Sequence, residues 1–248
     1  MNLPKIELPT FELEMPCTGK KVTFRPFLVK EQKILLMALE SKAEEDIIRG
    51  IKQIVSNCVI NKDFDVEDMS SVDLEYFFMN LRARSIGEKI NLNYTCKNIV
   101  EEKECNNIMK FEHDILSAKI ERDPTHDKTI FFTKDVGVVM KYPSMKMAEN
   151  MILKTKAKSK DKSDIDIALD IIIDCMDYIF EKENIFYIKE MNRDQVKDYI
   201  ENIPKTSFDK IEKFFNTMPK INSVAQHKCA KCGFEHNIKL DGITNFFV

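Results

Sequence analysis

The first region of the chain alternates apolar and polar residues in the manner of a β-hairpin. Phe11, Leu13 and Met15 interleave with glutamates, and a second alternating run follows the Cys-Thr-Gly segment at 17–19. A period of two residues is typical of a half-buried strand, and a glycine-containing segment between two such runs is typical of a turn. We therefore expect a hairpin over residues 9–27.

Three helices are expected next, because the apolar period changes to 3.6 residues. The predicted helices cover 29–41, 44–60 and a stretch that begins at Ser70 or Ser71 and stops near Gly87. The middle helix has the most sustained apolar stripe. Its members are Ile47, Ile48, Ile51, Ile54, Val55, Cys58 and Val59.

From Glu88 the alternation returns, which predicts a strand that leads into Cys96 and a second strand over Met109–Leu116. Short strands are expected over 130–132 and 136–142. The basic stretch Lys154–Lys162 has no apolar period and reads as a solvated loop or helix end, with partner binding as the alternative.

Helices are predicted again over 164–181, from Asn192 and from Thr206, and the tail returns to a strand, a cysteine pair and a strand. This grouping of strands and helices, without a βαβ alternation, indicates an α+β fold.

Four regions follow from this order. Residues 1–87 form the hairpin and helices, 88–143 form a β-rich region with the first cysteine pair, and 144–219 form an inserted helical subdomain. Residues 220–248 form a C-terminal knuckle hairpin that packs on 88–116, which completes a split ribbon.

Charge and composition exclude several classes of function. The 38 basic and 41 acidic residues give a net charge of −3, so the overall charge does not favour nucleic acid or an anionic membrane. No apolar run approaches the roughly 18 residues of a membrane span, and no secretory signal is visible. No phosphate-binding glycine loop or nucleophile elbow is present, so we expect no enzyme and no small-molecule substrate.

The cysteine pattern carries the most specific chemistry. Cys229 and Cys232 form a C-x-x-C-G turn, which is typical of a zinc knuckle, and Cys96 and Cys105 lie at a second predicted turn. In a reducing compartment such pairs favour metal over disulfides. We therefore predict a structural zinc site of four thiolates, with iron as an open alternative. His227 and His236 are substitute ligands, whereas Cys58 and Cys175 lie on apolar helix faces and read as core thiols.

A short repeat supports this pairing of the cysteines. Phe111-Glu112-His113 follows the first pair and Phe234-Glu235-His236 follows the second. Two hairpins with a cysteine pair at each turn are the two knuckles of a zinc ribbon. Four thiolates close the coordination sphere of zinc, which indicates a structural site and not a catalytic one.

Several segments together resemble the baseplate hub proteins of T4-like phages. They are the G-K-x-V-x-F-R-P-F-x-V-K-E segment from Gly19 to Glu31, LRARSIGE at 81–88, YTC at 94–96, the C-x-x-C-G turn and the LDGI-x-x-FF end at 240–247. The resemblance implies a non-enzymatic component of the central hub of a contractile tail. Its partners would be other hub and tail proteins, and it would lie in the bacterial cytoplasm during assembly and in the virion baseplate afterwards.

The resemblance leaves two further functions open, and it suggests contact residues. A transient assembly factor absent from the virion is one alternative, and a nucleic-acid-binding zinc ribbon is the other. Arg25, Phe27 and Lys30 match the family segment and are candidate partner contacts, although they also suit a strand end and a first helical turn. Phe246 and Phe247 are candidates as an apolar end that packs on this chain or on a neighbouring subunit.

Overall fold

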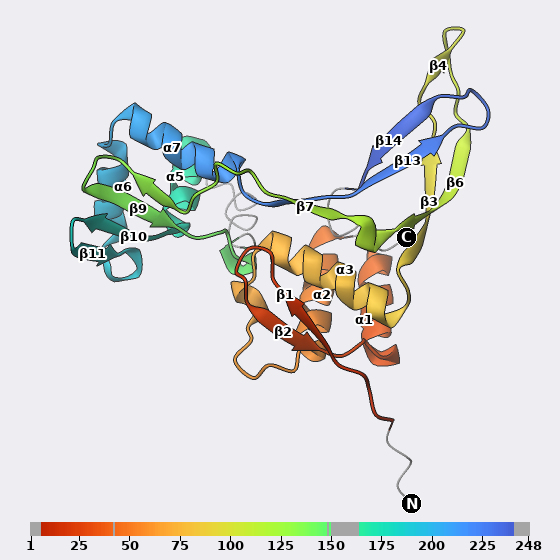
Figure 1. Cartoon of the computed structure of the whole chain (residues 1–248), viewed down its shortest axis with the longest axis horizontal. Helices are drawn as coiled ribbons and strands as arrows, with labels where there is room; N and C mark the ends of the chain where they lie inside the picture. Colours follow the sequence, from red (N-terminus) through yellow and green to blue (C-terminus); the bar gives the residue numbers. More distant parts are fainter. Residues whose placement is uncertain (1–5, 42, 148, 150–163, 241–248) are drawn as a thin grey trace, which may run out of the picture. The chain divides into compact units, whose positions relative to one another are not determined.

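A computed structural model describes residues 6–41, 43–147, 149 and 164–240 (Figure 1). The chain has an α+β fold with small antiparallel sheets, as the sequence predicts. It divides into two compact units. The first comprises 1–66, 72–121 and 220–248, and the second comprises 67–71 and 122–219.

The first unit begins with a hairpin and helices whose limits lie close to the predicted ones. The elements are β1 (Phe11–Glu14), β2 (Lys21–Phe24), α1 (Val29–Ser41), α2 (Glu44–Cys58) and α3 (Ser71–Ser85). The 3-10 turn η1 (Val66–Asp68) falls where the chain passes from the first unit into residues 67–71 of the second. Phe24 of β2 is buried and meets the ring of Phe77 of α3 edge to face, with 5.0 Å between ring centroids. Burial of these rings and of the apolar stripe of α2 stabilises this part of the chain.

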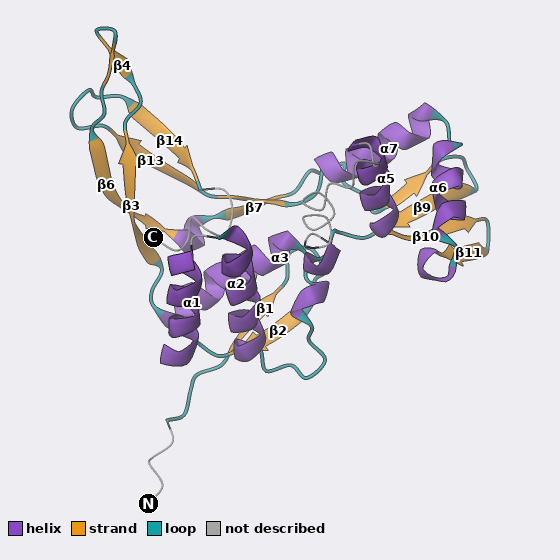
Figure 2. Ribbon diagram, turned by 180° about the vertical axis from the view of Figure 1, so that it is seen from behind, coloured by secondary structure: helices purple, strands orange, loops and turns teal. Residues whose placement is uncertain are grey.

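The rest of the first unit is built of two-stranded ribbons. Their elements are β3 (Lys89–Thr95), β4 (Ile99–Val100), β5 (Lys103–Glu104), β6 (Ile108–Asp114), the 3-10 turn η2 (Ile115–Ser117), β7 (Lys119–Glu121), β12 (Lys220–Asn222), β13 (Val224–Lys228) and β14 (Glu235–Lys239). The pairs are β3 with β6, β4 with β5, β7 with β12 and β13 with β14. Figures 1 and 2 both show β13 and β14 alongside β3 and β6.

An apolar cluster joins the two long ribbons to α3. Met79 and Ala83 of α3 pack with residues of β3 and with Ala225 of β13 and Leu240. Segments more than a hundred residues apart in sequence therefore share one core, and this core fixes where the cysteine turns lie.

The second unit contains a four-stranded antiparallel sheet in the order β11-β10-β9-β8, flanked by helices (Figure 2). Its elements are β8 (Thr129–Phe131), β9 (Val136–Met140), α5 (Asp164–Asp174), β10 (Met176–Glu181), β11 (Asn184–Tyr187), the 3-10 turn η3 (Ile188–Glu190), α6 (Arg193–Glu201) and α7 (Lys205–Asn216). One apolar core joins the strands to α5, α6 and α7.

Two predictions differ from the structure in this unit. A helix over 164–181 is wrong for its last third, because α5 ends at Asp174 and 176–181 form β10. The segment predicted to be a helical insert therefore contains strands as well. Residues 122–143, which the sequence pattern groups with the first cysteine pair, also lie in the second unit.

The caps of the last two helices are close to the predicted positions. The side chain of Asn192 accepts a hydrogen bond from the backbone N–H of Asp194 and so caps α6, whereas α7 begins at Lys205, one residue before the predicted cap Thr206. Lys154–Lys162 lies outside the described residues. Within the described part of the chain, no helix is both long and apolar enough to cross a bilayer.

Candidate metal centre

Two antiparallel ribbons bring four cysteines together. The last residue pair between β3 and β6 is Thr95 with Ile108. Cys96 follows β3 and Cys105 precedes β6, so both cysteines lie at the same end of that ribbon. The pairing of β13 with β14 leaves Cys229 and Cys232 in the turn between them. The four cysteines form one cluster with Met109, and three of them are buried.

The sulfur positions suit a tetrahedral metal ion. The Sγ atoms of Cys96 and Cys232 are 3.6 Å apart, those of Cys105 and Cys229 are 3.8 Å apart, and all four lie within 4.8 Å of one another. Zinc–sulfur bonds of about 2.3 Å in a tetrahedron place the sulfurs about 3.8 Å apart. The separations are also far longer than the roughly 2.05 Å of a disulfide bond. The donor set and spacing therefore fit zinc.

The two turns have the same backbone geometry. In the second turn, Gly233 has φ 71° and its N–H donates to the carbonyl of Cys229 at 2.8 Å. In the first, Asn106 has φ 51° and its N–H donates to the carbonyl of Cys96 at 3.0 Å. Glycine and asparagine are the residues that adopt this left-handed conformation most readily, so Asn106 is the counterpart of Gly233.

A second hydrogen bond closes each turn in the same way. The N–H of Cys229 donates to the carbonyl of Phe234, and the N–H of Cys96 donates to that of Asn107, both at 2.8 Å. Phe234 therefore corresponds to Asn107 and not to Phe111. The Phe-Glu-His likeness in the sequence is four residues out of register with the structural repeat.

The extra residues of the first turn form a small hairpin of their own. β4 and β5 lie between Cys96 and Cys105, and the N–H of Cys105 donates to the carbonyl of Asn98 at 2.8 Å across its base. Cys96 and Cys105 therefore keep the geometry of a C-x-x-C turn despite eight residues between them.

The two turns differ in their electrostatics. In the metal-free chain the backbone N–H of Cys232 lowers the pKa of Cys229 to about 6, and that of Phe234 lowers the pKa of Cys232. Burial raises the pKa of Cys96 to about 12 and also raises that of Cys105. The thiols of the second turn therefore lose their protons more readily than those of the first.

Neither histidine proposed as a substitute belongs to the cluster of four sulfurs. Nε2 of His236 lies 3.2 Å from Sγ of Cys96, which is a hydrogen-bond distance to one sulfur of the cluster. The ring of His227 stacks on Phe111 with 4.5 Å between centroids. Among the described residues, the cluster with metal-ligand spacing consists of the four cysteines.

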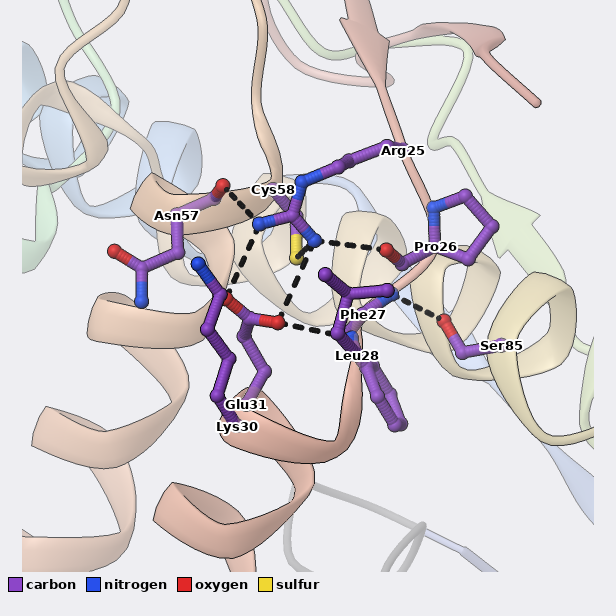
Figure 3. Close-up of polar contacts among 9 residues, drawn as sticks. All are labelled: Arg25, Pro26, Phe27, Leu28, Lys30, Glu31, Asn57, Cys58 and Ser85. Atoms are coloured by element: carbon purple, nitrogen blue, oxygen red, sulfur yellow. Dashed lines mark hydrogen bonds and ion pairs between the residues drawn. The ribbon is translucent and has the colours of Figure 1, made fainter. Parts of the chain in front are cut away.

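The family-like segment after β2 forms a buried polar cluster (Figure 3). The carboxylate of Glu31 is fully buried and accepts hydrogen bonds from Arg25 at 3.1 Å and from the N–H of Leu28 at 2.8 Å. Arg25 also donates to the carbonyl of Asn57 at 2.9 Å and lies 3.7 Å from Sγ of Cys58. The ion pair therefore ties the end of β2 to the start of α1 and the end of α2.

The other candidate contact residues lie in different environments. Phe27 is buried and its N–H donates to Oγ of Ser85 at 3.0 Å, whereas the side chain of Lys30 is 68% exposed. Phe246 and Phe247 lie outside the described residues. Partner binding by these residues and by Arg25 stays a prediction. The core position predicted for Cys58 and Cys175 is confirmed, since both thiols are buried.

Comparison with known proteins adds one finding. A family model described as T4 bacteriophage base plate protein matches residues 8–248, nearly the whole chain. No curated protein and no solved structure shows significant similarity to it.

Proposed function

Because the chain belongs to the T4 bacteriophage base plate protein family, we propose that it is a non-enzymatic structural component of the central hub in the baseplate of a contractile tail. The observation that carries this proposal is the extent of the family match, from residue 8 to residue 248. The chain would assemble with other hub and tail proteins in the cytoplasm of the infected bacterium and remain in the virion.

The metal centre serves this role as a structural clamp. Cys96, Cys105, Cys229 and Cys232 hold one zinc ion through four thiolates, which leaves no open position for a substrate or a reactive water. The ion cross-links the β3–β6 ribbon to the β13–β14 ribbon, which lies more than a hundred residues later in the chain. Because two-stranded ribbons are marginally stable alone, the bound ion fixes their mutual position for assembly.

We propose partner contacts at Lys30, in the first turn of α1, and at Phe246 and Phe247. Lys30 offers an exposed cation beside the buried Arg25–Glu31 pair. Phe246 and Phe247 offer large apolar side chains, which favour burial against protein. Phe27 is buried within the chain, so its contribution is to hold the start of α1 in place.

The experiment is quantitative mass spectrometry of purified virions of the encoding phage, together with tail assembly in a strain where the gene carries a stop codon. The proposal expects the chain in virions at a fixed ratio to other baseplate proteins, and no complete tails without it. A chain that is required for tails but absent from virions would instead be an assembly factor. Normal tails without the chain would contradict both functions.

The contacts of two lysines at the second cysteine turn argue against a ribbon that binds nucleic acid, because both side chains bond within the chain. Nζ of Lys231 donates to the carbonyl of Cys105 at 2.9 Å, and Lys228 pairs with Glu235 at 3.6 Å. A ribbon that binds nucleic acid presents basic side chains to phosphates. We therefore expect no salt-sensitive shift of DNA or RNA in a gel.

A further inference from the structure

An asparagine lies two residues after each cysteine of the first turn. The segments are Cys96-Lys97-Asn98 and Cys105-Asn106-Asn107, and both Asn98 and Asn107 are half-buried. In each case the backbone N–H of the asparagine donates to the sulfur of its own cysteine.

The side chains of the same two asparagines cross to the other ribbon. Nδ2 of Asn98 lies 3.7 Å from Sγ of Cys232, and Nδ2 of Asn107 lies 3.5 Å from Sγ of Cys229. Each asparagine therefore contacts one sulfur of each turn, the first through its backbone and the second through its side chain. The sulfurs that it joins are the close pairs, 3.6 Å and 3.8 Å apart.

Backbone conformation does not explain why asparagine occupies these positions. Among the described non-glycine residues, positive φ occurs at Glu101, Glu102, Asn106 and Lys182, and not at Asn98 or Asn107. Asn106 meets the need for a left-handed residue in the first turn. The feature that distinguishes Asn98 and Asn107 is the amide group that each aims at a sulfur.

We propose that Asn98 and Asn107 are positioning residues of the metal centre, and that each holds one sulfur from each turn at the spacing the ion requires. The inference rests on the proposed four-thiolate zinc site. Four thiolates around a divalent cation carry a net charge of −2, so amide donors stabilise the loaded site as well as orient it. Partners outside the ligand set typically change metal affinity by about 10- to 100-fold.

Matched substitutions separate the amide donor from packing and from charge. Asn107→Leu keeps a similar volume and removes the donor, whereas Asn107→Asp also places a carboxylate beside the sulfur of Cys229. Asn93→Asp makes the same charge change at an exposed residue of β3, outside both cysteine turns. Asn98→Leu tests the second contact independently, in case one variant fails to fold.

Zinc affinity is measured on the full chain by competition with a chromophoric chelator, and Co²⁺ spectra report whether four sulfurs still bind. We expect a loss of about 10- to 100-fold for Asn107→Leu and Asn98→Leu, a larger loss for Asn107→Asp, and wild-type affinity for Asn93→Asp. The Co²⁺ bands should keep the intensity of a four-thiolate site in the leucine variants.

Wild-type affinity in the Asn98 and Asn107 variants would overturn the inference and leave the metal site intact. Equal losses in Asn107→Asp and Asn93→Asp would also overturn it, because a general effect of charge would then suffice. A wild-type chain that folds and binds no zinc or cobalt would overturn the metal centre and, with it, the role of both asparagines.

Discussion

Replacing Glu31 with glutamine should destabilise the region where β2, α1 and α2 meet. The carboxylate is fully buried, and Glu31→Gln preserves its shape while it removes the negative charge beside Arg25. It also turns an amide donor toward either Arg25 or the N–H of Leu28, both of which are donors. The variant therefore leaves a largely buried guanidinium without its counter-charge.

The expected magnitude follows from how much of Arg25 remains solvated and bonded. Removing one partner of a buried ion pair costs about 3–5 kcal/mol. The Arg25 side chain is 16% exposed and keeps its hydrogen bonds to the carbonyls of Asn57 and Pro26, so we expect the lower end. A loss of about 3 kcal/mol corresponds to roughly 150-fold faster exchange of amides that open with this region.

Hydrogen exchange with mass spectrometry is the suitable assay, because it resolves α1 and α2 from the second unit. The matched control is Lys30→Gln, which removes a charge 3.5 Å from the same carboxylate on a side chain that is 68% exposed. Exposed pairs contribute at most about 1 kcal/mol, so the control should exchange nearly as wild type does.

Acid provides a second test of the same ion pair. Burial alone would raise the pKa of Glu31, but the hydrogen bonds from Arg25 and Leu28 outweigh it and hold that pKa below its ordinary value of 4.5. A lowered pKa means that the carboxylate stabilises the fold above about pH 4.5 and that this stabilisation is lost as pH falls through the folded-state pKa. Glu31→Gln should lack this acid dependence. Wild-type exchange in Glu31→Gln at neutral pH would refute the structural role of the segment and favour a partner contact there.

Three further results are expected from the geometry. Gly137→Ala should destabilise the sheet of the second unit by about 1–3 kcal/mol, seen as faster exchange in β8 and β9, because a Cβ at this position meets the carbonyl of Ile130 and the ring of Phe180. Gly233→Ala should weaken zinc binding by about 1–2 kcal/mol in chelator competition, since φ is 71° there, whereas Asn106→Gly should not weaken it. The pKa of Cys229 is about 6 without metal, so its thiol becomes protonated as pH falls through that value. Zinc binding should then release about one more proton per ion below pH 6 than above it. Calorimetry in buffers of different ionisation enthalpy measures the number of protons released.

The sequence predicted the elements whose apolar period is unambiguous. The predicted 29–41 helix coincides with α1, and the strand from Glu88 into Cys96 differs from β3 by about one residue at its start. The failure at 176–181 has a physical cause. Tyr178, Ile179 and Phe180 favour a strand locally, but their spacing also continues the apolar stripe of α5. Pairing with β9, a segment about forty residues earlier, decides the conformation.

The candidate metal centre was predictable in its ligands but not in its surroundings. The C-x-x-C-G turn and a second cysteine pair at a strand end were sufficient to nominate all four sulfurs. The Phe-Glu-His likeness led to the same pairing of the two cysteine turns that the structure has. It did so by coincidence, because Phe234 corresponds in space to Asn107 and not to Phe111. Asn98, Asn106 and Asn107 gave no separate signal, because side-chain contacts between ribbons depend on how the ribbons pack and not on local spacing.

The measurement that tests the four-cysteine centre most directly is the metal content of the chain purified without an affinity metal. We predict about one zinc per chain in the wild type and in Cys17→Ser, which alters a cysteine outside the cluster, and none in Cys229→Ser, with faster exchange in β13 and β14. A folded wild-type chain without zinc or iron, or a Cys229→Ser chain that retains its metal, would contradict the account.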